Sequence, residues 1–229
     1  MARKQPWFTE ISFDFLFFPR ITCYHMRQES HQRQRSDCSM SIRESLQERR
    51  SVYGLKKELP VSVEEVKRLV TETTELVPDA FNMRSQRVVL ALGAKQDALW
   101  DAVYDAFGGK VAREKIDGFQ AGAGTVLYFI DTDVVKGLQE KFPLYAANFP
   151  IWAQQANGML QISIWAGLRE LGVGANIQHY NPVIDDAVKK LFGLPERWQL
   201  IAQMPFGGIA TEPDAKEKED ITQRVMIAE

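Results

Sequence analysis

The sequence has little cysteine and little histidine. Only two of its 229 residues are cysteine, Cys23 and Cys38, and both lie among the first forty. Of the three histidines, only His179 lies beyond residue 39. These scarcities exclude a disulfide framework, a thiolate zinc site, a cysteine nucleophile and an all-histidine metal site from the rest of the chain. If that part is an enzyme, we expect no metal, and a bound cofactor that carries the difficult chemistry.

Neither sign of charge dominates, and no apolar run is long enough for a membrane span. Lys and Arg number 28 against 30 Asp and Glu, so any anion site must be local, and we expect no nucleic-acid partner. The apolar patch over residues 11–21 is too short to cross a bilayer and is interrupted by Asp14 and Pro19. We therefore predict a cytoplasmic protein with no membrane partner.

The first 39 residues differ in composition from those that follow. They hold both cysteines, two of the three histidines and seven aromatic residues, whereas Met40 opens a regular amphipathic pattern. We interpret residues 1–39 as a non-conforming extension, disordered or produced by start-site choice, in preference to a targeting or regulatory segment. Residues 40–229 are then the functional domain.

Hydrophobic periodicity in residues 40–229 predicts helices and strands around a small sheet. Ser62 and Glu65 have the spacing of a capping box, so a helix should begin there and end near Val77. The other predicted helices cover residues 42–50, 96–107, 133–141, 151–171 and 182–192, with one more between the first two main strands. The predicted strands cover residues 87–92, 125–130, 198–204 and 221–227, with a strand or extended loop at 174–179.

Two basic segments at opposite ends of this domain suit one anion. Arg49, Arg50 and Ser51 follow the first helix, and two guanidinium groups beside a hydroxyl can hold a phosphate. Lys216 and Lys218 follow the strand at 198–204 and are able to return to the same anion. Each segment also has a plain alternative, as a solvated helix end and a solvated tail.

Two other segments suit a flat heterocycle. The amide of Asn82 can both donate and accept at a ring edge, although an Asn may also cap its own loop. Gly172 should end the long helix, and Gly174, after Val173, would allow close approach to a planar ligand. His179 is either a catalytic base or an ordinary loop histidine, and we favour the second.

Taken in order, these motifs resemble the nitroreductase family, in particular its short branch named after a fungal fatty-acid-repression mutant. The resemblance covers about 190 residues, from Met40 to the C-terminus. The matching motifs are Arg49-Arg50-Ser51-x-Tyr53, Phe81-Asn82-x-x-Ser85-x-Arg87, Leu-Trp100-Asp101, Phe142-Pro143-Leu144-Tyr145, Gln178-His179-Tyr180-Asn181-Pro182 and Met204-Pro-Phe-Gly207.

The resemblance implies an α+β fold with a small mixed or antiparallel sheet flanked by helices, in an intertwined homodimer that holds FMN at its interface. It implies that Arg49, Arg50, Ser51 and Lys216 bind the FMN phosphate and ribityl chain. Asn82 would touch the flavin rim, from the second subunit. The backbone of Gly172, Val173 and Gly174 would run along the isoalloxazine.

The implied activity is reduction of nitroaromatics or quinones by NADH or NADPH in a ping-pong cycle, with a role in the stress response. No side chain is then catalytic, because flavin N5 carries the chemistry. Two differences from the family, at Asp79-Ala80 and Met83-Arg84, leave the rim contacts open, and a short segment between Thr125 and Ile151 implies an open pocket. A flavin-binding regulator linked to lipid or oxidative-stress signalling and a domain without flavin remain alternatives.

Overall fold

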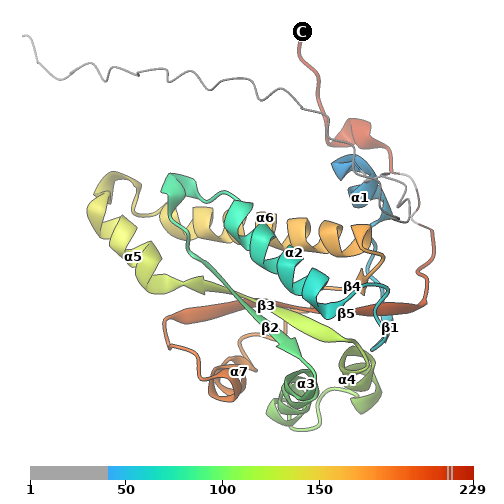
Figure 1. Ribbon diagram of the computed structural model, residues 1–229. Coiled ribbons are helices and arrows are strands. Elements are labelled where there is room, and N and C mark those ends of the chain that lie inside the picture. Colours follow the sequence, from blue (N-terminus) through green and yellow to red (C-terminus); the bar gives the residue numbers. More distant parts are fainter. Residues whose placement is uncertain (1–40, 216, 218) are drawn as a thin grey trace, which may run out of the picture. The chain divides into compact units, whose positions relative to one another are not determined.

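The structure is a computed structural model that describes residues 41–215, 217 and 219–229 (Figure 1). The interpretation of residues 1–39 lies outside this part of the chain. The described residues form seven α-helices, five strands and three short 3-10 helices. In chain order these are α1 (Ile42–Glu48), β1 (Gly54–Lys56), α2 (Val63–Leu76), η1 (Ala80–Asn82), β2 (Gln86–Leu92), α3 (Ala94–Ala106), α4 (Arg113–Gln120), β3 (Gly124–Asp131), α5 (Thr132–Lys141), η2 (Pro143–Tyr145), α6 (Phe149–Glu170), β4 (Gly174–Ala175), α7 (Asp185–Phe192), β5 (Trp198–Thr211) and η3 (Ile221–Gln223).

The strands form one antiparallel sheet in the order β1-β5-β3-β2, with β4 also paired to β5. Every residue of the central strand β3 is buried, because helices cover both faces of the sheet. Val126 and Tyr128 pack in a core with α2 and α6, and Leu127 and Phe129 pack in a second core with α3, α4 and α7 (Figure 1). This alternation along β3 confirms the predicted α+β class and the small antiparallel sheet.

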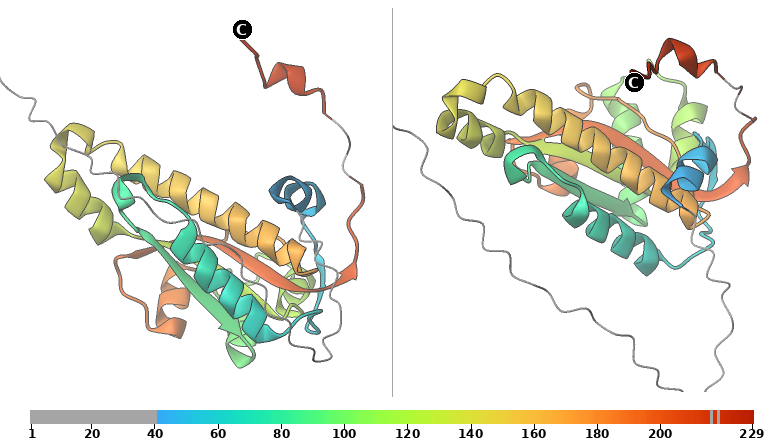
Figure 2. Two further views of the ribbon diagram at one scale, coloured as in Figure 1. Left: turned by 45° about the horizontal axis from the view of Figure 1, so that its top comes forward. Right: turned by 90° about the horizontal axis from the view of Figure 1, so that it is seen from above.

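Helix α6 lies along one face of the sheet, and its 22 residues span about 33 Å at 1.5 Å per residue (Figure 2). Its inner side contributes Leu160 and Ile164, both fully buried. Its outer side leaves Ile151, Met159 and Ile162 exposed by 55%, 42% and 37%. The outer side is therefore an apolar stripe that the described residues do not cover. In the part of the chain that the structure describes, no helix is both long and apolar enough to span a membrane.

The helix predicted from the capping box forms as expected. The Glu65 N–H donates to Ser62 Oγ at 3.2 Å, and the Ser62 N–H donates to Glu65 Oε2 at 3.0 Å. The helix ends with Val77 as its C-cap. The two reciprocal bonds satisfy donors that a helix start otherwise leaves open, so the local sequence alone is sufficient to place this terminus.

Strand β5 is longer than predicted, and β1 was not predicted. The segment after Met204 contains a proline and two glycines, which indicate a turn in sequence, yet the strand continues to Thr211. Gly207 and Gly208 lie against the carbonyl oxygens of Lys56 and Glu58, where a Cβ would not fit. The glycines therefore allow a second backbone to pair closely with β5, which is a tertiary effect.

The prediction of a strand at residues 221–227 is wrong. Residues 221–223 form the 3-10 helix η3, and Asp220 Oδ1 accepts hydrogen bonds from the backbone N–H and hydroxyl of Thr222. All of residues 219–229 are exposed, and they pair with no strand among the described residues. A local Asp-Thr hydrogen bond favours a turn over an extended chain that has no partner. The segment at 174–179, predicted as a strand or extended loop, forms strand β4 at Gly174–Ala175 and an isolated bridge at Gln178.

Candidate functional site

The predicted Arg49–Ser51 segment lies beside the chain that follows α6. Helix α1 ends with Arg49 as its C-cap, and Ser51 then forms a parallel bridge with Ala175. The Val52 N–H donates to the Ala175 carbonyl at 3.0 Å, and Asn176 Nδ2 donates to the Val52 carbonyl at 2.8 Å. The structure therefore brings the Arg-Arg-Ser segment next to the glycine segment, although more than 120 residues separate them.

The side chain of Arg49 is half-buried and has no polar partner in the part of the chain that the structure describes. Its guanidinium carbon lies 4.1 Å from the centroid of the Trp165 ring. Its Nε is buried and donates no hydrogen bond within the described residues. Burial, and to a smaller extent the charge of Arg50, lowers the pKa of Arg49 below its ordinary value. A cation in this state is stabilised by an anion that supplies acceptors and negative charge.

The nearby carboxylates are directed to another arginine. Arg169 Nη2 lies 3.6 Å from Glu48 Oε2, and Arg169 Nη1 lies 3.7 Å from Glu212 Oε1. Glu48 immediately precedes Arg49 in sequence, but no ion pair joins Arg49 or Arg50 to a carboxylate in the described part of the chain. Among the described residues, Arg49 and Arg50 are thus two adjacent cations without a carboxylate partner, which makes them a candidate local anion site in a chain whose net charge is −2.

The predicted glycine segment is mostly interior. Gly172 ends α6 with φ +73°, a left-handed conformation that a residue with a Cβ rarely adopts. Val173 is 1% exposed. A Cβ on Gly174 would lie 2.9 Å from side-chain carbons of Val52 and Ile209, so this chain's own residues fill the space that the missing side chain leaves. His179, further along, is exposed.

Asn82 lies in a strained turn between α2 and β2. Phe81, Asn82 and Arg84 all have left-handed φ values, of 56°, 49° and 53°. The turn is closed by the Asp79 carboxylate, which accepts from the Ser85 N–H at 2.9 Å and the Ser85 hydroxyl at 2.7 Å. The Asn82 side chain is exposed, and its Oδ1 accepts from Arg84 Nε at 3.2 Å. Three left-handed residues within four positions make this turn a candidate functional feature.

The two halves of the predicted site lie at opposite ends of α6. Arg49 contacts Trp165 near the helix C-terminus. The Phe81 ring stacks on Trp152 near the helix N-terminus, with centroids 5.7 Å apart. These tryptophans are thirteen positions apart in the helix, which corresponds to about 20 Å. Figure 1 shows α1 beside one end of α6 and the turn before β2 beside the other. Within one chain, Asn82 is therefore not brought to Arg49.

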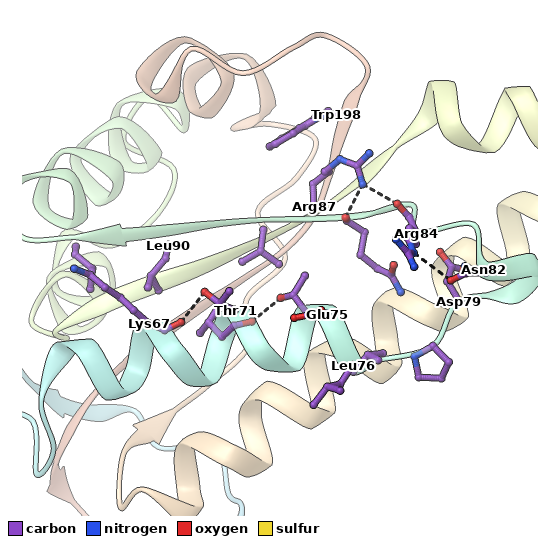
Figure 3. Close-up of a pocket in the computed structure, with 17 residues that line it drawn as sticks. Lys67, Thr71, Glu75, Leu76, Asp79, Asn82, Arg84, Arg87, Leu90 and Trp198 are labelled. Atoms are coloured by element: carbon purple, nitrogen blue, oxygen red, sulfur yellow. Dashed lines mark hydrogen bonds between the residues drawn. The ribbon is translucent and has the colours of Figure 1, made fainter. Parts of the chain in front are cut away.

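A groove of about 840 Å³ lies between α2 and β2 (Figure 3). Asn82, Arg84 and Arg87 line its end, and neither Arg49 nor the glycine segment lines it. Arg87 donates to the carbonyl oxygens of Arg84 and Gln86 and pairs with Asp131 at 3.1 Å, so its charge is already compensated. The groove and the Arg49 site are thus separate features of the molecule.

Lys216 and Lys218 lie outside the described residues, so the expected return of a lysine to Arg49 stays a prediction. Among the described residues, no group of three or more histidine, cysteine, aspartate or glutamate side chains is arranged to hold a metal ion.

Sequence reasoning missed Trp165 and Asn176, which hold the Arg49–Ser51 segment in place. Their contacts with Arg49 and Val52 are long-range, so no local motif marks them. One sequence signal was available for Trp165. It lies one turn before Arg169, near the predicted end of the long helix.

An antiparallel sheet between two helical layers, with a half-buried arginine beside the segment that follows α6, defines an α+β protein with a candidate anion site. Residues 46–208 match the model of the nitroreductase family. The chain is 36% identical over 171 residues to the nitroreductase FRM2 of Saccharomyces cerevisiae, covering 73% of this chain and 88% of that protein. It also resembles the solved structures of the nitroreductase CinD from Lactococcus lactis. The CinD complex with chloramphenicol matches this chain with a TM-score of 0.79, and the complex with 4-nitrophenol matches with a TM-score of 0.78. In both, CinD is 42% identical to this chain, and the match covers 82% of this chain and all of CinD. The protein belongs to the nitroreductase family and is an oxidoreductase.

Proposed function

We propose that this protein is an FMN-dependent oxidoreductase that reduces nitroaromatics or quinones with NADH or NADPH. The observation that carries the proposal is the half-buried Arg49 beside the residues that follow α6, because its Nε and its charge have no partner among the described residues. The similarity of this chain to CinD, which was solved with two nitroaromatic compounds, supports the acceptor class. A cytoplasmic location of this protein and a role in the stress response stay predictions.

Arg49, Arg50 and Ser51 suit the phosphate of FMN. The unsatisfied donor and the charge of Arg49 favour a dianion, and the neighbouring guanidinium and hydroxyl add further donors. Lys216 would complete the set. When bound, FMN supplies an N5 atom that takes a hydride from the nicotinamide and passes electrons to the acceptor. The protein then binds, orients and shields the reactants, and the nicotinamide and acceptor occupy one pocket in turn.

The separation of Arg49 from Asn82 favours a homodimer. A two-fold axis perpendicular to α6 would place the C-terminal end of one helix beside the N-terminal end of the other. The partner subunit's Asn82 would then approach Arg49 and the flavin rim. The apolar stripe of Ile151, Met159 and Ile162 offers the surface on which two α6 helices would pack. We therefore propose that each FMN site uses both subunits.

An absorption spectrum of the purified full-length protein tests this function. We expect oxidised-flavin bands, release of FMN on heating, and rapid reoxidation of the reduced protein by 4-nitrophenol or a quinone. Bound FMN with negligible turnover would favour the regulatory alternative. A colourless protein that fails to bind added FMN would contradict the proposal.

A further inference from the structure

The indole of Trp165 is fixed by a hydrogen bond to the backbone beside the anion site. Trp165 lies on α6, and its Nε1–H donates to the Ala175 carbonyl at 3.2 Å. The same carbonyl accepts the Val52 N–H at 3.0 Å. One backbone oxygen therefore ties the indole to the strand-like segment that carries Ser51. The ring cannot rotate without breaking this bond, so the face that it presents is constant.

The Arg49 guanidinium lies over that face, and its side chain makes no hydrogen bond or ion pair within the described residues. The guanidinium carbon lies 4.1 Å from the ring centroid, within the range of a cation–π contact. Stacking uses the flat face of a guanidinium and leaves its in-plane N–H donors for another ligand. Because Glu48 is paired with Arg169, the adjacent carboxylate does not compete for Arg49.

We propose that Trp165 is a positioning residue that holds the Arg49 guanidinium in the orientation needed to bind the phosphate of FMN. The inference rests on the proposed FMN function. An unsupported arginine would lose several side-chain rotations when it binds an anion, whereas a stacked arginine has already lost them. Trp165 thus acts through Arg49 and favours the phosphorylated flavin over riboflavin, which has the same ring system and no phosphate.

The experiment compares the affinities of FMN and riboflavin for flavin-free full-length protein, measured by quenching of flavin fluorescence. Trp165→Leu removes the aromatic face, and we expect it to raise the Kd for FMN about tenfold and to leave the Kd for riboflavin unchanged. Trp165→Phe keeps a face and should retain most of the FMN preference. Trp165→Met, which has an unbranched and more adaptable side chain without a ring, replaces the leucine variant if that variant does not fold.

A double-mutant cycle with Arg49→Gln separates positioning from a structural role. We expect Arg49→Gln to abolish most of the preference for FMN, and Trp165→Leu to change nothing further in that background. Equal losses of FMN and riboflavin binding, or additive effects of the two substitutions, would overturn the positioning role. If Arg49→Gln lowers the FMN preference and Trp165→Leu does not, Trp165 is excluded and the phosphate site stands. If Arg49→Gln has no effect, the phosphate site and the role of Trp165 both fail.

Discussion

The two ends of α6 carry the two halves of the candidate site, and they are built in different ways. At the C-terminal end, Arg49 is positioned by Trp165, and its segment pairs with Ala175, both distant in sequence. At the N-terminal end, Asn82 lies in a turn closed by a hydrogen-bonded pair only six residues apart, Asp79 and Ser85. One half depends on tertiary contacts and the other on local geometry.

The difference follows from the group that each half offers to a ligand: a charged guanidinium in one and a neutral amide in the other. A half-buried cation without a carboxylate is costly, so its position must be fixed by the folded body of the domain. An exposed amide costs little, and a strained turn suffices to project it outward. The buried half suits a phosphate, and the exposed half suits a contact made to another molecule, as the proposed dimer requires.

The largest effect that we expect is at the buried half. Arg49→Gln removes the charge and should raise the Kd for FMN about 100-fold, because charge-assisted bonds to a phosphate are among the strongest in proteins. The measurement is a titration with FMN. Arg43→Gln is the matched control, because Arg43 is an exposed cation on α1, and we expect a change of less than about twofold. Similar losses in both variants would show that only overall charge matters.

Mixing subunits tests whether the two halves act across a dimer. If each site pairs Arg49 with the partner subunit's Asn82, random exchange between Arg49→Gln and Asn82→Ala proteins restores about a quarter of all sites. Half of the dimers are then mixed, and each mixed dimer has one site with neither substitution. FMN bound at limiting concentration reports the intact sites, with each variant alone as the control. No recovery after verified exchange would place both residues in one subunit.

The local features of this molecule could be predicted from its sequence. The capping box at Ser62 and Glu65, the strand that became β3 and the long helix α6 all follow from patterns within one element. The Arg49 and Asn82 motifs were also recognised, because each lies within a few residues. These features need no knowledge of what packs against them.

What the sequence did not reveal depends on contacts between distant segments. The extension of β5 past Gly207 depends on the close approach of Lys56, and the role of Trp165 depends on where α1 ends. The predicted strand at 221–227 failed for the opposite reason, because a strand pattern needs a partner to form. The separation of Arg49 from Asn82, whose segments lie beside tryptophans about 20 Å apart along α6, likewise appears only when the length of α6 is known.

Asp79→Ala should destabilise the turn that carries Asn82, because the partly buried Asp79 carboxylate closes that turn. The substitution leaves the N–H and hydroxyl of the fully buried Ser85 without their acceptor, which costs about 2–3 kcal/mol in the free energy of unfolding. Urea denaturation measures this loss. Asp79→Asn keeps an acceptor oxygen and is the control, with a smaller loss expected. Equal stability of all three proteins would mean that the turn is not held by this carboxylate.

The smallest effect that we expect separates stability from binding at Asn82. Its φ of 49° is unfavourable for most residues and free of steric cost for glycine, so Asn82→Gly should leave the stability within about 0.5 kcal/mol of the parent in urea denaturation. The same substitution removes the amide and should weaken FMN binding severalfold, because one neutral hydrogen bond is lost.

Asn82→Ala removes the amide as well, but it forces a Cβ into the left-handed region and should also lower the stability by about 1 kcal/mol. If glycine and alanine weaken FMN binding equally while only alanine lowers the stability, the amide itself makes the contact. If glycine leaves FMN binding intact, the turn presents something other than Asn82, and the exposed half of the site must be assigned to a neighbouring side chain.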